Sequence, residues 1–446
     1  MKKKNIIFYF SDQQRWDTMG CYGQRLNVTP NLDKLAQEGT LFENAYTCQP
    51  VCGPARACVQ TGLYATEVNC HKNNHILPIG MDTLARRMIA GGYETAYIGK
   101  WHLASMEGSS YRTLPVPVER RGGYEYWMVA DALEATSHGY NGYVYDGDMK
   151  KHEFVGHRID CINAFAIDYL HTYKESGSEK PFFLFVSQLD PHHQNDHNRY
   201  EGPDGSKKKF ADYDVPGDLI GLDGDWKENY PDYLGQCNLL DQNIGKLMDT
   251  LDALDLKDDT ILLYTCDHGS HFRTRNAEYK RACEDACLHI PLIAWGGPFM
   301  GGGRINELVS LLDMPSTILD AAGIEVPAHY RGDSVLKLVK GEKENWKDMV
   351  YAQISEAQTA RTVRTLKYKY AVRAPQFDIT QPYSEVYWED KLYDLEKDPH
   401  ERNNVVSDPA YEDVRKEMRE RMYISMAKAN EPRCSILNCE GKEPNQ

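Results

Sequence analysis

The sequence has no long hydrophobic run and no excess of positive charge. In its 446 residues no stretch approaches the ~18 consecutive apolar residues of a membrane-spanning helix, so we expect no membrane partner. The formal net charge of −15 argues against nucleic-acid binding, which needs clustered positive charge to displace counterions. Internal repeats and low-complexity tracts are also absent, which excludes a repeat architecture.

The twelve cysteines lack the close spacing of a metal finger or a small disulfide-rich domain. We therefore interpret them as mostly reduced thiols and expect a cytoplasmic protein. The lysines at positions 2–4 and the apolar residues after them imitate a secretory signal, but this run is short and ends in Ser11 and Asp12. A signal removed before residue 1 stays an alternative.

Strand-like and helix-like stretches alternate from the start of the chain to about residue 323. Expected strands are 6–10, 93–102, 182–186, 260–265 and 290–295, and expected helices are 29–39, 52–62, 82–90, 159–173, 234–254 and 314–322. This alternation predicts an α/β fold with a large mixed, mostly parallel sheet between helices. Residues 104–153 and 194–232 lack regular spacing, and we expect long loops there that face the substrate.

Near residue 331 the alternation stops. Short strands at 349–354, 362–371 and 386–395, followed by a charged helix at 411–427, predict a smaller α+β unit. We therefore expect two units: an α/β domain over residues 1–340, and a C-terminal subdomain with a small antiparallel sheet and a helix over residues 341–446.

Polar side chains follow two of the expected strands at their carboxyl ends. Asp12 and Gln13 come after the first strand, and Asp267 and His268 come after the strand at 260–265. Ligands of open α/β sheets gather at this edge, so these residues are candidates for a metal site. An acid after a strand is often only a helix cap, so each signal alone is weak.

The stretch 47–62 combines a cysteine, a proline, an arginine and a glycine in an order typical of one short helix. Pro54 suits the first turn of a helix, so Cys52 is expected at or just before its start, and Gly62 at its end. The start of a helix favours negative charge, which would place a group at residue 52 to meet an anion. A buried cysteine beside a helix start is the simpler interpretation of this stretch alone.

Together the motifs resemble those of the type I sulfatases, the formylglycine-dependent members of the alkaline phosphatase superfamily. Residues 52–56 with 61–62 are similar to the family's first signature, and residues 92–102 to its second. The later motifs follow in the family's order: residues 267–269, Lys280, residues 290–293 and residues 392–404. The resemblance covers nearly the whole chain and implies an alkaline phosphatase-like fold and a sulfatase that hydrolyses a sulfate ester on a sulfated carbohydrate.

The same resemblance implies a modified residue and a metal. A formylglycine-generating maturase would oxidise Cys52 to formylglycine; one hydroxyl of its hydrate would attack sulfur, and the second would release sulfate by collapsing to the aldehyde. One divalent cation would be bound by Asp12, Gln13, Cys52, Asp267 and His268. Oxygen ligands suit Ca²⁺. One imidazole, with Gln13 where the family usually has an aspartate, leaves Mn²⁺ as the alternative.

The resemblance also implies the roles of the remaining site residues. Arg56 would orient the ionised diol, and His102 would assist the release of sulfate. Lys100 and Lys280 would bind the sulfate oxygens and offset the charge of the transition state. His192 would contact the ester oxygen and protonate the leaving alcohol.

Two other functions stay open at this point. Gln13 and His268 make the pattern similar to some phosphonate monoester hydrolases and choline sulfatases, so a phosphonate monoester hydrolase or phosphodiesterase is one alternative. The other is a non-catalytic protein that binds sulfated glycans, if Cys52 is not converted. Asp241, on the expected helix at 234–254, is left as a capping or pairing carboxylate.

Overall fold

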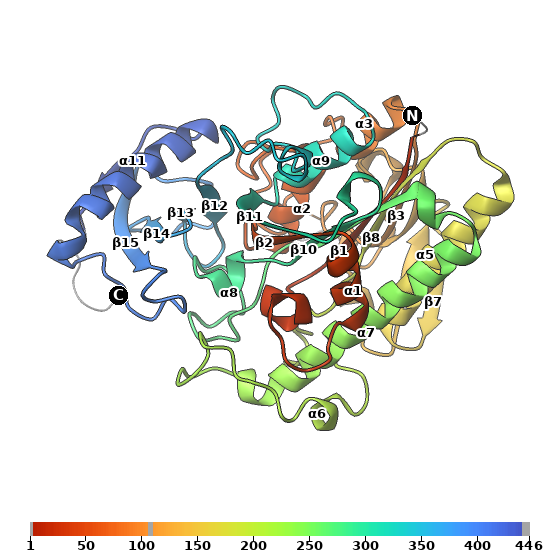
Figure 1. Cartoon of the computed structure of the whole chain (residues 1–446), viewed down its shortest axis with the longest axis horizontal. Coiled ribbons are helices and arrows are strands. Elements are labelled where there is room, and N and C mark those ends of the chain that lie inside the picture. The colour runs from red at the N-terminus through yellow and green to blue at the C-terminus, as the bar shows by residue number, and fades with distance from the viewer. Residues whose placement is uncertain (1–2, 106–109, 439–446) are drawn as a thin grey trace.

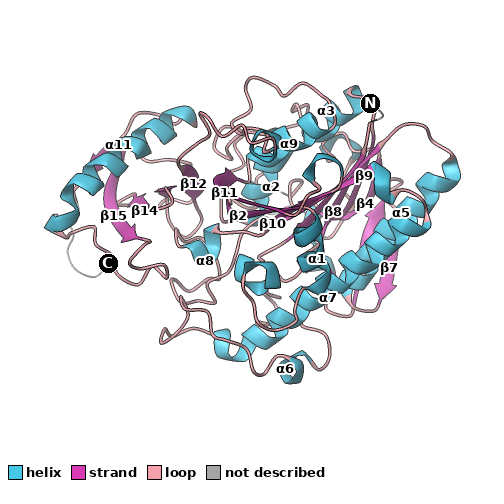
Figure 2. Cartoon of the chain, in the orientation of Figure 1, coloured by secondary structure: helices cyan, strands magenta, loops and turns pink. Residues whose placement is uncertain are grey.

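The computed structural model describes residues 3–105 and 110–438. Within these ranges the chain forms two β-sheets, a large one and a smaller one close to the C-terminus (Figure 1). Helices pack on both faces of the large sheet (Figure 2). The predicted α/β class with a second, smaller unit is confirmed.

The large sheet has the strand order β11-β2-β10-β9-β1-β8-β3-β4-β6-β5, with β7 paired to β6. Neighbouring strands from β9 to β4 are parallel, whereas β10 and the edge formed by β5, β6 and β7 are antiparallel. This arrangement confirms the mixed, mostly parallel sheet. The strands are β1 (Asn5–Ser11), β2 (Thr40–Tyr46), β3 (Glu94–Lys100), β4 (Tyr126–Ala130), β5 (Ser137–His138), β6 (Asn141–Asp146), β7 (Lys151–Val155), β8 (Phe182–Ser187), β9 (Thr260–Cys266), β10 (Leu292–Trp295) and β11 (Gly303–Ser310).

Strand β1 lies in the interior of this sheet and is buried along its whole length. Its side chains alternate between the two faces: Ile6, Phe8 and Phe10 join one hydrophobic cluster, and Ile7 and Tyr9 join the other. A strand that is covered on both faces has an unbroken apolar sequence, which explains why residues 6–10 could be predicted as a strand from the sequence.

Three helices cover each face of the large sheet. One face carries α2 (Cys52–Thr61), α3 (Leu84–Ala90) and α9 (Asp313–Ala321), and the other carries α1 (Pro30–Glu38), α5 (Arg158–Ser176) and α7 (Trp226–Ala253) (Figure 1). Shorter helices are α4 (Leu133–Thr136), α6 (Ser206–Lys209), α8 (Asp285–Leu288) and α10 (Leu336–Val339). Asp241 of α7 accepts hydrogen bonds from the backbone N–H groups of Asn31 and Leu32, so it caps the start of α1.

The smaller sheet has the strand order β12-β13-β14-β15-β16. Helix α11 (Glu412–Lys428) packs on it, and the core between them includes Val363, Leu392, Met418 and Met422. A turn divides the stretch that we expected at 362–371 between two strands. The strands are β12 (Val350–Ile354), β13 (Ala360–Arg364), β14 (Tyr368–Arg373), β15 (Val386–Asp394) and β16 (Ser435–Leu437).

The prediction that residues 104–153 form only a long loop is wrong for the described part of that stretch. It supplies β4, β5, β6 and β7, which extend the large sheet at one edge. These strands are short and partly exposed, so they lack a sustained apolar run, but tyrosine and valine favour this environment. Residues 106–109 of the stretch lie outside the described residues.

The helix predicted at 234–254 begins earlier, at Trp226, and contains Pro231. We expected irregular chain up to residue 232 because residues 194–232 lack regular spacing. Proline also disfavours a helix interior. Instead, Trp226, Tyr230 and Tyr233 pack into an aromatic cluster with Phe272. Burial of these rings outweighs the local cost of the proline.

Strands β2 and β11 were also missed, because neither has a long apolar run.

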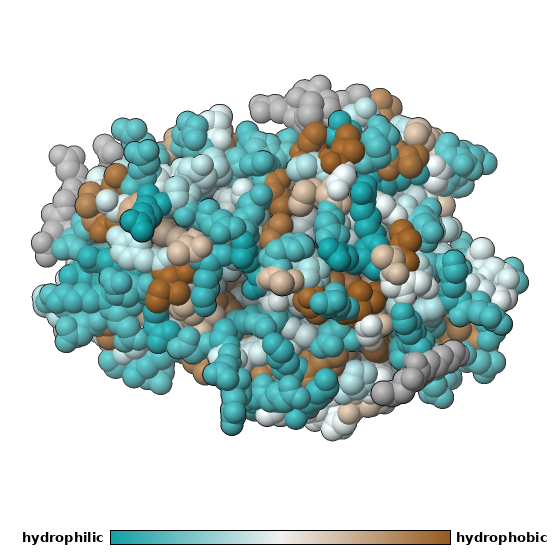
Figure 3. All heavy atoms as spheres, turned by 90° about the horizontal axis from the view of Figure 1, so that it is seen from above, coloured by the Kyte–Doolittle hydropathy of each residue, from teal (hydrophilic) through white to brown (hydrophobic). Residues whose placement is uncertain are grey.

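The eleven cysteines within the described residues are all free, as expected for mostly reduced thiols. Among those same residues, no helix combines the length and apolar character needed to cross a membrane. On the face shown in Figure 3, hydrophilic side chains predominate and hydrophobic ones form small scattered groups.

Candidate active site

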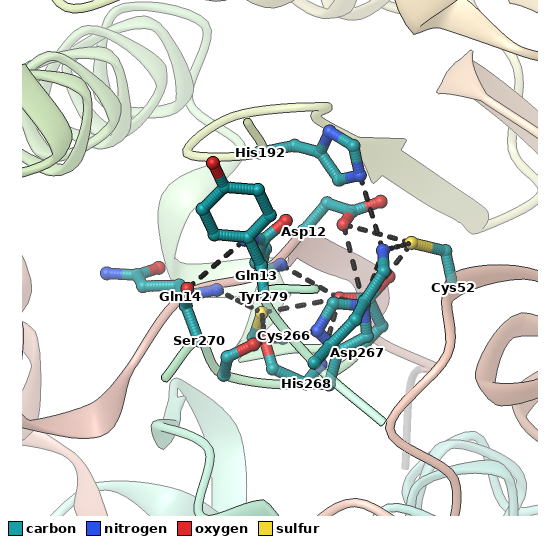
Figure 4. Close-up of polar contacts among 12 residues, drawn as sticks. Asp12, Gln13, Gln14, Cys52, His192, Cys266, Asp267, His268, Ser270 and Tyr279 are labelled. Carbon is teal, nitrogen blue, oxygen red and sulfur yellow. Dashed lines mark hydrogen bonds and ion pairs between the residues drawn. The ribbon is translucent and has the colours of Figure 1, made fainter. Parts of the chain in front are cut away.

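Cys52 is the first residue of α2, and every residue of that helix is buried. The helix ends at Gly62, whose left-handed backbone (φ 68°) suits glycine, so the predicted helix start and stop are confirmed. The Cys52 sulfur lies 3.3 Å from Asp12 Oδ1 and 3.2 Å from His268 Nε2, and Lys280 Nζ donates to it at 2.7 Å (Figure 4). Residue 52 is therefore surrounded by one carboxylate, one imidazole and one ammonium group.

The strand ends bring the predicted metal ligands together. Strands β1 and β9 are parallel neighbours in which Ser11 pairs with Cys266, so the residues that follow them leave the sheet side by side. One ligand atom from each of Asp12, Cys52, Asp267 and His268 lies within 4.8 Å of the others, and all four residues are buried. The geometry thus assembles four of the five predicted ligands.

This cluster fits a divalent cation. Within the described residues, Asp267 Oδ2 is buried without a hydrogen-bond partner; Arg56 Nη2 lies 3.6 Å away, so the oxygen can still serve as a ligand. Burial and the nearby Asp12 raise the pKa of Asp267, and a cation between the two carboxylates would relieve that repulsion. His268 Nδ1 lies 2.9 Å from the carbonyl of Gly269, so its Nε2 faces the cluster, and burial together with Lys280 lowers its pKa and keeps it neutral.

Gln13, the fifth predicted ligand, borders the same group of residues. Its backbone is left-handed (φ 67°), and its N–H donates to Asp267 Oδ1 at 3.0 Å. The side-chain Nε2 donates to Tyr200 Oη at 2.8 Å and to Ser270 Oγ at 3.2 Å. These contacts fix the nitrogen end of the amide and leave its oxygen as the acceptor that could serve a cation.

Two buried cations share Asp12. Arg56 Nη2 lies 3.0 Å from Asp12 Oδ2, and Lys100 Nζ lies 2.9 Å from the same oxygen. Burial alone would raise the pKa of Asp12, but the surrounding positive charges, Lys100 foremost, hold it well below its usual range. Arg56 also donates to Ser187 Oγ at 2.5 Å. Asp12 is therefore ionised and orients both cations.

Lys280 contacts both Cys52 and His192. Lys280 Nζ lies 3.3 Å from His192 Nε2 (Figure 4). Burial and the neighbouring Lys280 lower the pKa of His192 well below its ordinary value. Since an ammonium can only donate, His192 Nε2 accepts here, and the imidazole is neutral.

Sequence analysis missed Glu134, a nearly buried residue of α4. Its Oε2 lies 3.3 Å from Lys100 Nζ, and its Oε1 lies 3.9 Å from His102 Nε2. Burial and Lys100 lower the pKa of His102 to about 3, so that imidazole is neutral. No motif in the sequence indicates Glu134, because it falls in the stretch that we interpreted as a loop.

A cavity of about 480 Å³ lies next to Cys52. Its walls come from both units of the chain: Gln13, His102, Glu134, His192 and Lys280 from the region of the large sheet, and Glu356, Ile379 and Thr380 from loops of the smaller sheet. Arg281, which follows Lys280, donates to Glu356 at 2.7 Å and thereby joins the two sides. The sequence did not predict that the smaller unit contributes to the pocket.

The cysteine itself is poorly suited to act as a thiolate. Burial, reinforced by Asp12, raises the pKa of the Cys52 thiol to about 12. A neutral thiol is a weak nucleophile and a weak metal ligand. At neutral pH residue 52 is therefore a protonated thiol and not a thiolate.

Comparison with known proteins identifies the family of this chain. Residues 4–324 match the sulfatase family, and residues 278–428 match the family described as N-sulphoglucosamine sulphohydrolase, C-terminal. An ulvan-active sulfatase of Formosa agariphila is 30% identical in an alignment of 432 positions that covers 93% of this chain and 80% of that protein. An N-acetylglucosamine-6-O-sulfatase of Bacteroides thetaiotaomicron is 26% identical over 94% of this chain and 85% of that protein. The chain belongs to the sulfatase family of the alkaline phosphatase superfamily and is a sulfuric ester hydrolase.

Solved structures share the fold over the whole chain. That of yidJ from Bacteroides fragilis has a TM-score of 0.83 at 24% identity and covers 97% of both chains. That of BT4656 in complex with its substrate D-glucosamine-2-N,6-O-disulfate has a TM-score of 0.77 at 23% identity, over 96% of this chain and 98% of the other. The roles that we assign to individual site residues stay predictions.

Proposed function

We propose that this sulfatase hydrolyses a sulfate ester on a sulfated carbohydrate through a formylglycine formed from Cys52. Two relatives support the substrate class by their names, an N-acetylglucosamine-6-O-sulfatase and an ulvan-active sulfatase. The observation that carries the proposal is the position of Cys52, buried among Asp12, His268 and Lys280 beside a polar cavity.

Formylglycine at residue 52 would supply a hydrated aldehyde: one hydroxyl would displace the alcohol from sulfur, and loss of the proton of the other would regenerate the aldehyde as sulfate leaves. Arg56, held by Asp12 and Ser187, would orient the attacking oxygen. His102, neutral and next to Glu134, would accept the proton that is released as sulfate departs.

The metal that we propose is Ca²⁺. Asp12, Asp267, Gln13, His268 and residue 52 would hold it, and the carboxylate and amide oxygens are ligands that Ca²⁺ prefers. The imidazole of His268 keeps Mn²⁺ as the alternative. A cation there would also offset the negative charge of Asp12 and Asp267.

Lys100, Lys280 and His192 would hold the ester. Lys280 contacts residue 52 and Lys100 contacts its neighbour Asp12, so each would be near enough to bind a sulfate oxygen. A bound sulfate would oppose the effect of Lys280 on His192 and favour its protonation. His192 could then deliver a proton to the leaving alcohol.

The proposal is tested on protein produced together with a formylglycine-generating maturase. The peptide that contains residue 52 should be about 18 Da lighter than its cysteine form, because the thiol is exchanged for a carbonyl oxygen. The converted protein should release sulfate from defined sulfated mono- or disaccharides, and Cys52→Ala should not. Full activity with an unconverted thiol would contradict the formylglycine, and a converted protein that is inactive on every sugar would contradict the substrate class.

Removal of the metal gives a second test. Chelation should abolish sulfate release, because Asp12 and Asp267 would again repel each other and residue 52 would lose its partner. Ca²⁺ should restore the rate at least as well as Mn²⁺. Activity that survives complete removal of divalent cations, confirmed by elemental analysis, would contradict the proposed metal.

The same pocket could act on phosphorus esters. A relative of 26% identity over 92% of this chain is the multifunctional alkaline phosphatase superfamily protein PehA of Trinickia caryophylli. Matched sulfate, phosphonate and phosphodiester substrates would rank the activities, and a higher kcat/KM for a phosphorus ester would replace our proposal. The cytoplasmic location stays a prediction.

A further inference from the structure

A second group of metal-binding side chains lies outside the catalytic site. His138, Asp196 and His197 each place one ligand atom within 4.8 Å of the others. His138 belongs to β5, whereas Asp196 and His197 lie in the loop after β8, so two separate segments meet here. The two histidines also line a cavity of about 480 Å³.

Hydrogen bonds orient these side chains. His197 Nδ1 lies 2.5 Å from Glu201 Oε1, which leaves Nε2 as the nitrogen available to a metal. A carboxylate on the far nitrogen is the usual arrangement around a metal-bound histidine, and it fixes the ring. Gln194 Nε2 donates to Asp196 Oδ1 at 2.7 Å, and Asp196 Oδ2 lies 2.8 Å from His138 Nε2.

The group is accessible to ions. The side chains of His138, Asp196 and His197 are 41%, 58% and 38% exposed. The imidazole rings are stacked with their centroids 4.1 Å apart, and one nitrogen of each ring lies within 4.8 Å of the other two ligand atoms of the group. Two imidazoles and one carboxylate form a donor set that suits Zn²⁺ better than Ca²⁺, with room for water as a fourth ligand.

We propose that His138, Asp196 and His197 bind a divalent transition metal such as Zn²⁺ and that the ion clamps two active-site segments together. One segment carries Glu134 just before β5, and the other carries His192 just before the loop ligands. Gln194 already links them, because its Nε2 donates to the carbonyl of Glu134 at 3.0 Å as well as to Asp196. The site does not depend on the proposed function, since none of its ligands belongs to the catalytic group.

The test measures zinc bound by the full-length protein in the presence of saturating Ca²⁺, by equilibrium dialysis and elemental analysis. The unchanged protein should bind one more Zn²⁺ per chain than His138→Ala or His197→Ala, and Zn²⁺ should raise its unfolding temperature but not theirs. Any zinc bound at the Cys52 site would be the same in all variants, so it does not affect the difference in zinc content between them.

His152→Ala is the matched control, since His152 pairs with Asp146 at 2.6 Å outside the cluster. It should bind zinc as the unchanged protein does. Glu201→Gln keeps all three ligands and should weaken binding about 10- to 100-fold. Circular dichroism without metal confirms that each variant is folded. Equal zinc content in the unchanged protein and a folded His197→Ala variant would overturn the proposal.

Discussion

Lys100 illustrates how burial and pairing set the charge of one side chain. Its ammonium lies between Asp12, at 2.9 Å, and Glu134, at 3.3 Å, in a buried environment. Burial alone would lower the pKa of Lys100, but Asp12 and the other acidic neighbours raise it above its usual value. The side chain is therefore a cation at neutral pH, which suits the sulfate-binding role that we propose for it.

Replacing this cation should slow the reaction. Lys100→Ala is expected to lower kcat for sulfate release about 10²- to 10³-fold, because a fixed charge that faces the transition state is lost. Glu134→Gln should have a smaller effect, since Asp12 still holds Lys100. Steady-state kinetics on one sulfated sugar measures both variants. An unchanged kcat in folded Lys100→Ala would show that Lys100 does not serve the transition state.

The sequence predicted those site residues that belong to motifs at strand ends. Asp12 and Asp267 follow apolar strands, and parallel pairing of β1 and β9 brings them together as the pattern indicates. Glu134 and Glu356 could not be predicted in this way, because no local pattern accompanies them and only tertiary packing brings them to the cavity.

At the scale of secondary structure, the contact between β3 and β8 positions Lys100. Gly99 precedes it in a left-handed conformation (φ 105°), and a Cβ atom there would lie 1.9 Å from the carbonyl oxygen of Ser187. Only glycine allows the two strands to approach this closely. Ser187 is also the residue that accepts a hydrogen bond from Arg56, so this close approach supports two site residues.

Gly99→Ala should therefore destabilise the protein by at least about 2 kcal/mol, through the clash with the backbone and the left-handed strain. Gly177→Ala is a matched control, because Gly177 is also left-handed (φ 65°) but has no atom within 4 Å of an added Cβ. The control should cost about 1 kcal/mol. Chemical denaturation compares the two, and equal losses would mean that the close approach is not required.

Central elements could be predicted from sequence, and edge elements could not. A strand such as β1, covered on both faces, must be apolar throughout, whereas β4 to β7 at the sheet edge tolerate polar residues. Helix α7 begins earlier than the sequence predicted, for a different reason. There an aromatic cluster outweighs the local effect of Pro231, and local propensity cannot reveal that.

At the scale of the whole molecule, buried ion pairs connect the two sheets. Glu284, next to α8, lies 2.5 Å from Lys391 and accepts a hydrogen bond from Tyr393 at 3.0 Å, both on β15. Burial alone would raise the pKa of Glu284, but Lys391 and the nearby Arg275 lower it below its usual value. A carboxyl group whose pKa is lower in the folded than in the unfolded protein stabilises the fold at pH values above its unfolded pKa, which is 4.5 for Glu284. This stabilisation is lost as the pH falls below that value.

Glu284→Gln should lower the free energy of unfolding by about 3 kcal/mol at neutral pH, because it leaves Lys391 without its buried partner. The difference from the unchanged protein should shrink below about pH 4.5. Glu396→Gln provides the control: its partner Lys367 is 3.0 Å away on the surface, and the loss should stay below about 1 kcal/mol. A pH-independent loss in Glu284→Gln would contradict the electrostatic account.

The smaller unit also reaches the catalytic cavity. Glu356, in the loop between β12 and β13, pairs with Arg281 directly after Lys280. Glu356→Gln is expected to lower kcat/KM by up to about 100-fold, because a small displacement of Lys280 disturbs the geometry of the reacting groups. An unchanged unfolding temperature of Glu356→Gln would exclude a general loss of stability as the cause. Unchanged kinetics in Glu356→Gln would show that Lys280 is positioned without the smaller unit.

The position of β1 has a consequence for biosynthesis. This strand leaves the ribosome before every other strand described here, yet its two neighbours are β8 and β9, and β9 ends at Cys266. The centre of the sheet therefore cannot close until about 200 residues have followed Cys52. At ordinary rates of translation this takes roughly 10 to 40 s. During that interval residue 52, which folding later encloses, would still be open to the maturase that we propose, so the order of the strands would set the time available for its conversion.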